Sequence, residues 1–89
     1  MTDEQQQRII EMGRQAAQLR DNPTLEACFS TTLEDLFTRW CGTTAADGDE
    51  RMAIWSTAQA LRELKTTIDT FVSTGKLEEK NREYDRNKH

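Results

Sequence analysis

The spacing of hydrophobic residues near the start of the chain predicts a first helix. Apolar residues recur there every three or four positions, at Ile9, Met12, Ala16 and Leu19. This interval is that of one helix face, and Thr2 followed by Gln5 has the spacing of a capping box. The pattern predicts a helix over about 3–20. Gly13 lies within this stripe and costs about 1 kcal/mol relative to alanine, so the helix needs a surface on which to pack.

A second helix is predicted over about 23–41. Asn22 is a good N-cap residue, and Pro23 fits the first helical position, where its missing N–H has no cost. Gly42 is well placed to end the helix. The core-facing stripe has spacings of four, four, three and four residues, at Leu25, Phe29, Leu33, Leu36 and Trp40.

A third and longer helix is predicted over about 48–74. Asp47 followed by Glu50 is an N-terminal signature, and Gly75 is expected to end the helix. The core-facing residues are Ile54, Leu61, Leu64, Ile68 and Phe71. The remaining segment, "KLEEKNREYDRNKH", is strongly charged and has almost no apolar residue. We expect residues 1–75 to form a single helical domain and residues 76–89 to be a charged tail or a helical extension.

The predicted fold class is all-α. At 1.5 Å per residue the second helix is about 28 Å long and the third about 40 Å long. The break between them is short, so they are expected to fold back as an antiparallel helical hairpin. The third helix then extends beyond the second, and the additional N-terminal helix could cover this part.

Composition and charge narrow the class of partner. The 89 residues carry a net charge of −4: residues 1–50 hold ten acids and four bases (−6), and residues 51–89 hold six acids and eight bases (+2). An acidic chain argues against nucleic-acid binding, which needs a basic face. No apolar run approaches 18 residues and the N-terminus is polar, so we expect no membrane span and no signal peptide.

The two cysteines indicate a reducing compartment. Cys28 and Cys41 fall on one predicted helix, with backbones roughly 20 Å apart. A disulfide needs Cα atoms within about 7 Å, so this helix excludes one. We therefore expect the protein in the cytoplasm.

No group of residues in the sequence indicates catalysis or a cofactor. The acids Asp47, Asp49 and Glu50 lack the ordered ligand series of a calcium loop, and helix capping and the helix dipole explain them. The single histidine, His89, is the last residue, and four zinc ligands are not available. We find no phosphate loop or nucleophile motif. The prediction is a non-enzymatic protein with no metal site and no cofactor.

A surplus of apolar residues beyond the main stripes indicates contact with other protein. Trp40 ends one helix of the hairpin and Trp55 begins the next, so both rings should lie near the turn. Each ring either seals the thin core or stays exposed as an interface anchor, a role in which tryptophan is enriched. The surplus residues are Phe37, Met52, Trp55 and Val72, and together they predict an apolar patch larger than a monomer usually exposes. The candidate interface residues are Phe37, Trp40, Trp55, Phe71 and Val72.

The arrangement of these segments resembles a known group of proteins. "DNPTLEACFSTTLEDLFTRW", a short polar break and "DERMAIWSTAQALRELKTTIDTFVSTGKLEE" are similar to small helical proteins from the head and DNA-packaging genes of tailed bacteriophages. The similar features are the Asn–Pro start, the aromatic-ended helix, the "ER…W" entry and the closing "TGKL". The resemblance covers about residues 20–79. It implies an accessory role in virion assembly or packaging, and a location in the host cytoplasm or the virion. It transfers no catalytic or ligand residue.

The sequence therefore favours a protein–protein interaction module that acts as an accessory assembly protein, either self-associating as a homo-oligomer or bound to a larger phage or host protein. Two alternatives remain open. One is a small acidic inhibitor or regulator of a host protein, which predicts clustered carboxylates and a salt-sensitive complex. The other is a DNA-packaging component, for which only Arg51, Arg62, Lys65 and the tail offer basic residues.

Overall fold

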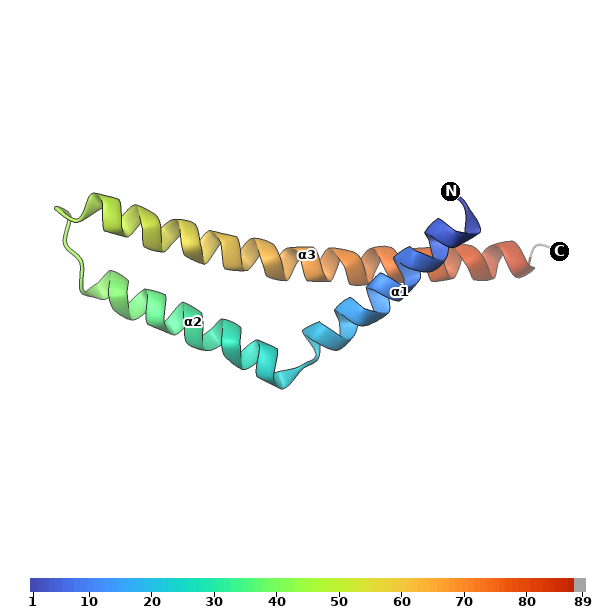
Figure 1. Ribbon diagram of the computed structural model, residues 1–89, viewed down its shortest axis with the longest axis horizontal. Coiled ribbons are helices and arrows are strands. Elements are labelled where there is room, and N and C mark those ends of the chain that lie inside the picture. The colour runs from blue at the N-terminus through green and yellow to red at the C-terminus, as the bar shows by residue number, and fades with distance from the viewer. Residues whose placement is uncertain (88–89) are drawn as a thin grey trace. The chain divides into compact units, whose positions relative to one another are not determined.

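The described part of the chain consists of three α-helices. A computed structural model describes residues 1–87, in which α1 spans Asp3–Arg20, α2 spans Pro23–Cys41 and α3 spans Gly48–Asn87 (Figure 1). The described residues contain no strand. The all-α fold class predicted from the sequence is confirmed.

The first two helices begin where their capping residues predict. The hydroxyl of Thr2 accepts a hydrogen bond from the backbone N–H of Gln5 at 3.1 Å, and the Gln5 side chain accepts one from the Thr2 N–H at 2.9 Å. At the start of α2 the Asn22 side chain accepts hydrogen bonds from the N–H groups of Thr24 (2.8 Å) and Leu25 (3.2 Å). These bonds satisfy N–H groups that have no partner within a helix.

The third helix is longer than predicted. It does not end at Gly75 but continues to Asn87, and no glycine adopts a positive φ. Of the two alternatives for the charged segment, residues 76–87 are therefore a helical extension. The start of α3 also differs in detail, because the Asp47 carboxylate accepts hydrogen bonds from the N–H and hydroxyl of Thr44, at 2.8 and 3.2 Å. Asp47 thus stabilises the turn that precedes the helix.

The helices form two compact units. Residues 22–65 form one, here called the hairpin unit, and residues 1–21 with the chain from Thr66 onward form the other, here called the crossing unit. Helix α3 contributes to both. Each unit is described by itself.

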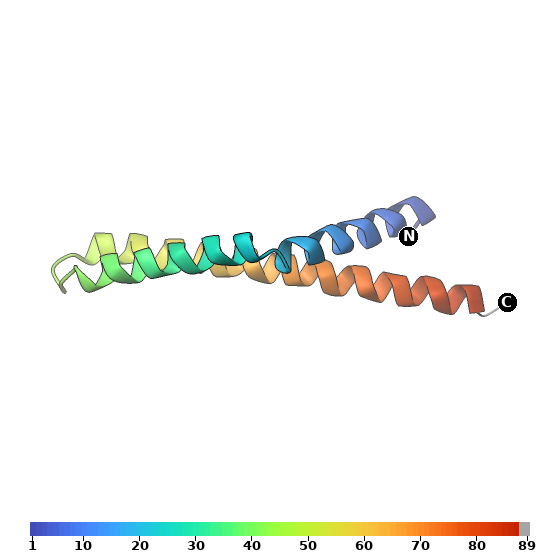
Figure 2. The same cartoon turned by 90° about the horizontal axis from the view of Figure 1, so that it is seen from below.

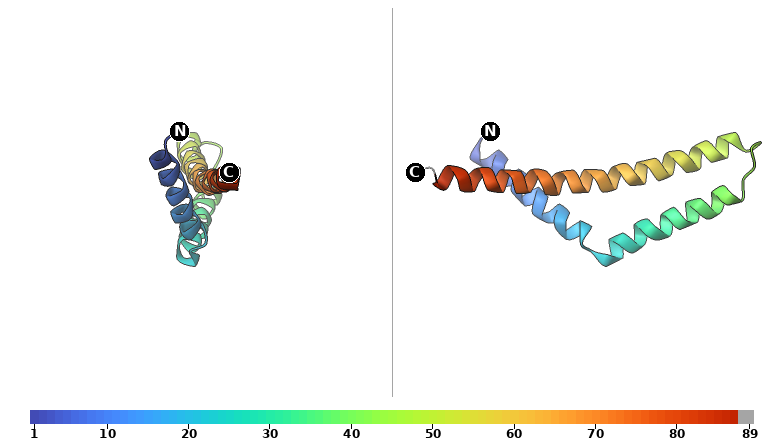
Figure 3. Two further views of the ribbon diagram at one scale, coloured as in Figure 1. Left: turned by 90° about the vertical axis from the view of Figure 1, so that its right-hand side faces the viewer. Right: turned by 180° about the vertical axis from the view of Figure 1, so that it is seen from behind.

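In the hairpin unit, α2 runs antiparallel to the first part of α3 (Figure 3). Its buried hydrophobic side chains are Phe29, Leu36 and Ile54. Two contacts fix the register of the helices: the Lys65 ammonium lies 3.4 Å from the Glu26 carboxylate, and the Arg51 guanidinium lies over the Trp40 ring. The predicted antiparallel hairpin is present, with the predicted α2 stripe toward α3.

In the crossing unit, α1 runs antiparallel to the C-terminal half of α3 (Figure 2). The buried residues are small or apolar: Ile10, Gly13, Ala16, Val72 and Gly75. Polar contacts flank them. The Gln6 amide donates to the Glu78 carboxylate at 3.0 Å, and the Arg14 guanidinium pairs with Glu79 at 3.0 Å. Residues 76–87 thus supply polar partners to α1.

Part of the predicted core-facing stripe is exposed in α1 and α3. Leu64 and Phe71 were expected in the core but are exposed, whereas Val72 is buried. In α1, Met12 and Leu19 are exposed and Ile10 is the most buried side chain. In the crossing unit the close approach of Gly13 to Gly75 explains the change, because α1 packs on the side of α3 that carries Gly75. Leu64 belongs to the hairpin unit, where it precedes Lys65 of the seam and is turned about 100° away from it.

Candidate interaction surfaces

The chain leaves more large hydrophobic side chains exposed than it buries. Among the described residues six hydrophobic side chains are buried, three in each unit, and ten large ones are at least 44% exposed. Single exposed apolar residues are normal on protein surfaces. A group of them on one face is not, and marks a site of interaction.

One such group lies on the hairpin unit. Phe37 is 68% exposed and Trp55 is 54% exposed. Phe37 follows the buried Leu36 by one residue, and Trp55 follows the buried Ile54 by one residue. Each ring is therefore turned about 100° from the seam between the helices. Because the helices are antiparallel, equal rotations along each chain bring both rings to the same side.

The two rings also lie at the same level along the hairpin. The contacts that fix the register pair residue 40 with residue 51 and residue 26 with residue 65. Residue 37 then lies opposite residue 54, next to Trp55. Met52, 62% exposed, is one helical turn from Trp55 on the same side. We call this surface the aromatic face; it comprises Glu34, Phe37, Cys41, Met52, Trp55 and Arg62.

Trp40 has a different position from Trp55. Its ring is half-buried, and the Arg51 guanidinium lies 4.8 Å from the ring centre. Arg51 also donates to the hydroxyl of Thr43 at 2.7 Å and to its carbonyl at 3.2 Å, and the Thr43 hydroxyl donates to the Trp40 carbonyl at 2.7 Å. Trp40 therefore closes the core at the turn, and Trp55 is the exposed ring.

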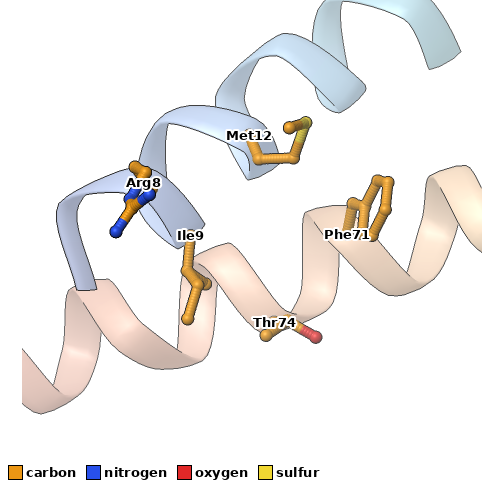
Figure 4. Close-up of a pocket in the computed structure, with 5 residues that line it drawn as sticks. All are labelled: Arg8, Ile9, Met12, Phe71 and Thr74. Atoms are coloured by element: carbon orange, nitrogen blue, oxygen red, sulfur yellow. The ribbon is translucent and has the colours of Figure 1, made fainter. Parts of the chain in front are cut away.

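Phe71 lines a groove in the crossing unit. The groove holds about 230 Å³ and is lined by Arg8, Ile9, Met12, Phe71 and Thr74. In Figure 4, Arg8, Ile9 and Met12 extend from α1 while Phe71 and Thr74 extend from α3. The lining is apolar apart from Arg8 and Thr74. This volume accommodates a single large side chain of another protein.

Val72 is not at the surface. It is only 3% exposed and lies beside Ile10 and Gly13 at the contact between α1 and α3. As an interface candidate it is corrected to a core residue. The physical reason is that α1 covers the side of α3 on which Val72 lies, so the structure brings neither Val72 nor Trp40 into an exposed surface.

Sequence reasoning missed two residues that shape these surfaces. Met12 was assigned to the core but lies in the groove, and Arg51 was weighed only as a basic residue. An arginine eleven residues after Trp40, on the far side of a short turn, was the available signal for Arg51. For Met12 the available signal was Gly75, which is distant in sequence. Its contact with Gly13 sets which face of α1 is buried and so leaves Met12 exposed.

The described residues show no site for a metal or a membrane. No three histidine, cysteine or acidic side chains in residues 1–87 come together in a way that could hold a metal ion. None of the helices in this range has the length and hydrophobicity needed to span a bilayer. Cys28 and Cys41 are free and exposed on α2, and His89 lies outside the described residues.

The chain was compared with protein families, curated proteins and solved structures. No protein-family model matches the chain, and neither the curated proteins nor the solved structures contain a match. The function proposed below rests on the physical features of this chain and on the resemblance of its segments.

Proposed function

We propose that this protein is a non-enzymatic protein–protein interaction module that self-associates. One observation carries the proposal: Phe37 and Trp55 lie side by side on the aromatic face, where they are 68% and 54% exposed. Large apolar side chains grouped on one exposed face mark a site of contact with other protein, and aromatic residues are enriched in such contacts.

The thin core supports the same proposal. Three buried hydrophobic side chains in each unit are few for a chain of 89 residues. Small folds with limited cores commonly gain stability from oligomerisation, a metal or disulfides. The cysteines are free. Association with a second chain is the source of stability that the exposed aromatic side chains favour.

The biological setting we propose is the assembly of a tailed phage, in which the protein is an accessory structural component. The resemblance of residues 20–79 to small helical phage proteins favours this setting. A structural role of this kind is compatible with the exposed apolar and aromatic side chains, which are suited to binding another protein.

Light scattering coupled to size exclusion tests self-association. The full chain should elute as a discrete oligomer at micromolar concentration, at both low and moderate salt, because the proposed contact is largely apolar. A mass of one chain at every concentration up to about millimolar would overturn the proposal of self-association.

One observation favours a second candidate, an acidic inhibitor or regulator. The hairpin unit carries seven acids and four bases, a net charge of −3. Glu34, Asp35, Asp49 and Glu50 are exposed, and no ion pair is recorded for any of them among the described residues. An acidic surface of this kind suits a basic partner. Such a complex should weaken strongly with salt, whereas the apolar self-contact should not.

A further inference from the structure

We infer that a second copy of this chain covers the aromatic face of the hairpin unit, so that two hairpins form a four-helix bundle. The inference rests on the proposed self-association and specifies its surface and symmetry. A two-helix hairpin buries one stripe of each helix, and pairing of two hairpins is a common way to bury a second stripe.

The exposed side chains of this face suit a copy of itself. Phe37, Met52 and Trp55 supply its apolar area. Aromatic residues and methionine are enriched in interfaces. The two charged residues of the face, Glu34 and Arg62, have opposite signs, and no ion pair is recorded for either within the described part of the chain. Such a face is complementary to a second copy when the symmetry of the dimer brings the negative charge of one copy next to the positive charge of the other.

A two-fold axis parallel to the helices provides that complementarity. It places α2 of one copy over α3 of the other, with the chains antiparallel at every neighbouring pair of helices. Phe37 then meets Trp55 of the partner subunit, because both lie at the same level of the hairpin. Glu34 lies about five residues along the helix, roughly 7.5 Å, from the level of Arg62 of the partner subunit. The glutamate and arginine side chains together span this distance.

The extent of the aromatic face favours a second copy over a short peptide as the occupant. The face includes residues of both helices, from Glu34 to Cys41 and from Met52 to Arg62, and is too large for the contact of one side chain. The groove of the crossing unit, at about 230 Å³, accommodates only one. A second pair of helices covers residues of both helices, and in a two-fold dimer each copy makes the same contact with the other.

Substitution of the two rings tests the surface. Phe37→Glu and Trp55→Glu should each raise the dimer dissociation constant at least 100-fold, because a carboxylate is then placed in an apolar contact. Leu64→Glu is the matched control: Leu64 is 50% exposed in the same unit but precedes Lys65 in the seam, and so lies on the opposite side. It should leave the dimer intact. Circular dichroism shows whether each variant keeps its helices.

A charge exchange tests the symmetry and does not depend on the rings. Glu34→Arg and Arg62→Glu should each weaken the dimer about three- to tenfold, and the double variant should restore most of the affinity. Because both positions are exposed in the single chain, neither substitution should unfold it. If each single substitution weakened the dimer and the double variant did not restore its affinity, the proposed two-fold arrangement would be overturned.

The outcomes separate this inference from the proposed function. If the native chain is monomeric at all concentrations, self-association itself fails. If it is oligomeric and both ring variants stay oligomeric, self-association stands and the aromatic face is not the contact; Met12→Glu then tests the groove. If the ring variants dissociate while the Leu64 variant does not, the aromatic face is the contact.

Discussion

Gly13 of α1 and Gly75 of α3 meet backbone to backbone. A Cβ atom placed on Gly13 would lie 2.8 Å from the Cα of Gly75 and 2.9 Å from the carbonyl oxygen of Phe71, and one placed on Gly75 would lie 2.8 Å from the Cα of Gly13. Both glycines are buried. A Cβ atom cannot form a hydrogen bond and does not approach another heavy atom this closely, so a side chain at either position forces the helices apart.

Gly75→Ala should therefore destabilise the protein. Alanine is the better helix former by about 1 kcal/mol, but separating two packed helices costs about 1–3 kcal/mol. We expect the second effect to prevail, because the atoms in the way belong to the backbone and cannot rotate aside. Urea unfolding followed by circular dichroism measures the change.

Gly48→Ala is the control for this substitution. No atom lies within 4 Å of a Cβ placed on Gly48, and its φ is not positive. The substitution at the first residue of α3 should be neutral or stabilise the protein by a few tenths of a kcal/mol. Equal effects of the alanines at positions 48 and 75 would contradict the tight crossing.

The same glycines show where sequence reasoning stops. Capping patterns are local, and they located α1 and α2, whose bounds agree with those predicted. Gly75 resembles a helix end by the same local rule, but its role is set by Gly13, 62 residues earlier. No pattern within one helix carries that information.

The candidate site was predictable to a similar extent. Phe37 and Trp55 were identified as surplus to the apolar stripes, and they are exposed because each is one residue beyond a buried one. Val72 was also identified as surplus to the seam, but α1 covers it. Which surplus residues stay exposed depends on where a third helix lies, and hydrophobic periodicity does not specify this.

Arg51→Ala should destabilise the turn of the hairpin by about 1–2 kcal/mol. The substitution removes the cation–π contact with Trp40 at 4.8 Å and two hydrogen bonds to Thr43, each of modest net value. Fluorescence in a Trp55→Phe background, which leaves Trp40 as the only tryptophan, should report a more solvated ring. Arg39→Ala is the control, since Arg39 is exposed and no partner is recorded for it among the described residues. No change in the emission of Trp40 would contradict the stacked arrangement.

Asn22→Ala should lower the free energy of unfolding by about 1 kcal/mol. The amide oxygen of Asn22 accepts from two N–H groups at the start of α2, and alanine leaves both without this partner. Thermal unfolding measures the loss. Asp21→Ala, one residue earlier, is the comparison: Asp21 forms an exposed ion pair with Arg20, and such pairs contribute little. If the Asp21 variant were as unstable as the Asn22 variant, capping of α2 by the Asn22 side chain would not explain the loss.

Ending the chain after Gly75 should release α1, although that is where the sequence suggested that the domain ends. Beyond Gly75 lie the partners of α1: Glu78 accepts from Gln6, Glu79 pairs with Arg14, and Arg82 donates to Gln6 and Gln7. Helices in proteins gain most of their stability from packing on other elements, and Gly13 weakens this helix further. Hydrogen exchange should therefore show at least a tenfold loss of amide protection in α1. Protection in α2 should be unchanged, because its contacts lie within the hairpin unit.

The full-length Lys80→Ala variant controls for loss of charge in the segment, and it should behave as the native chain does. If the shortened chain kept full protection in α1, the apolar contact at Gly13 and Gly75 would suffice to hold the helix, and residues 76–87 would not be needed for it.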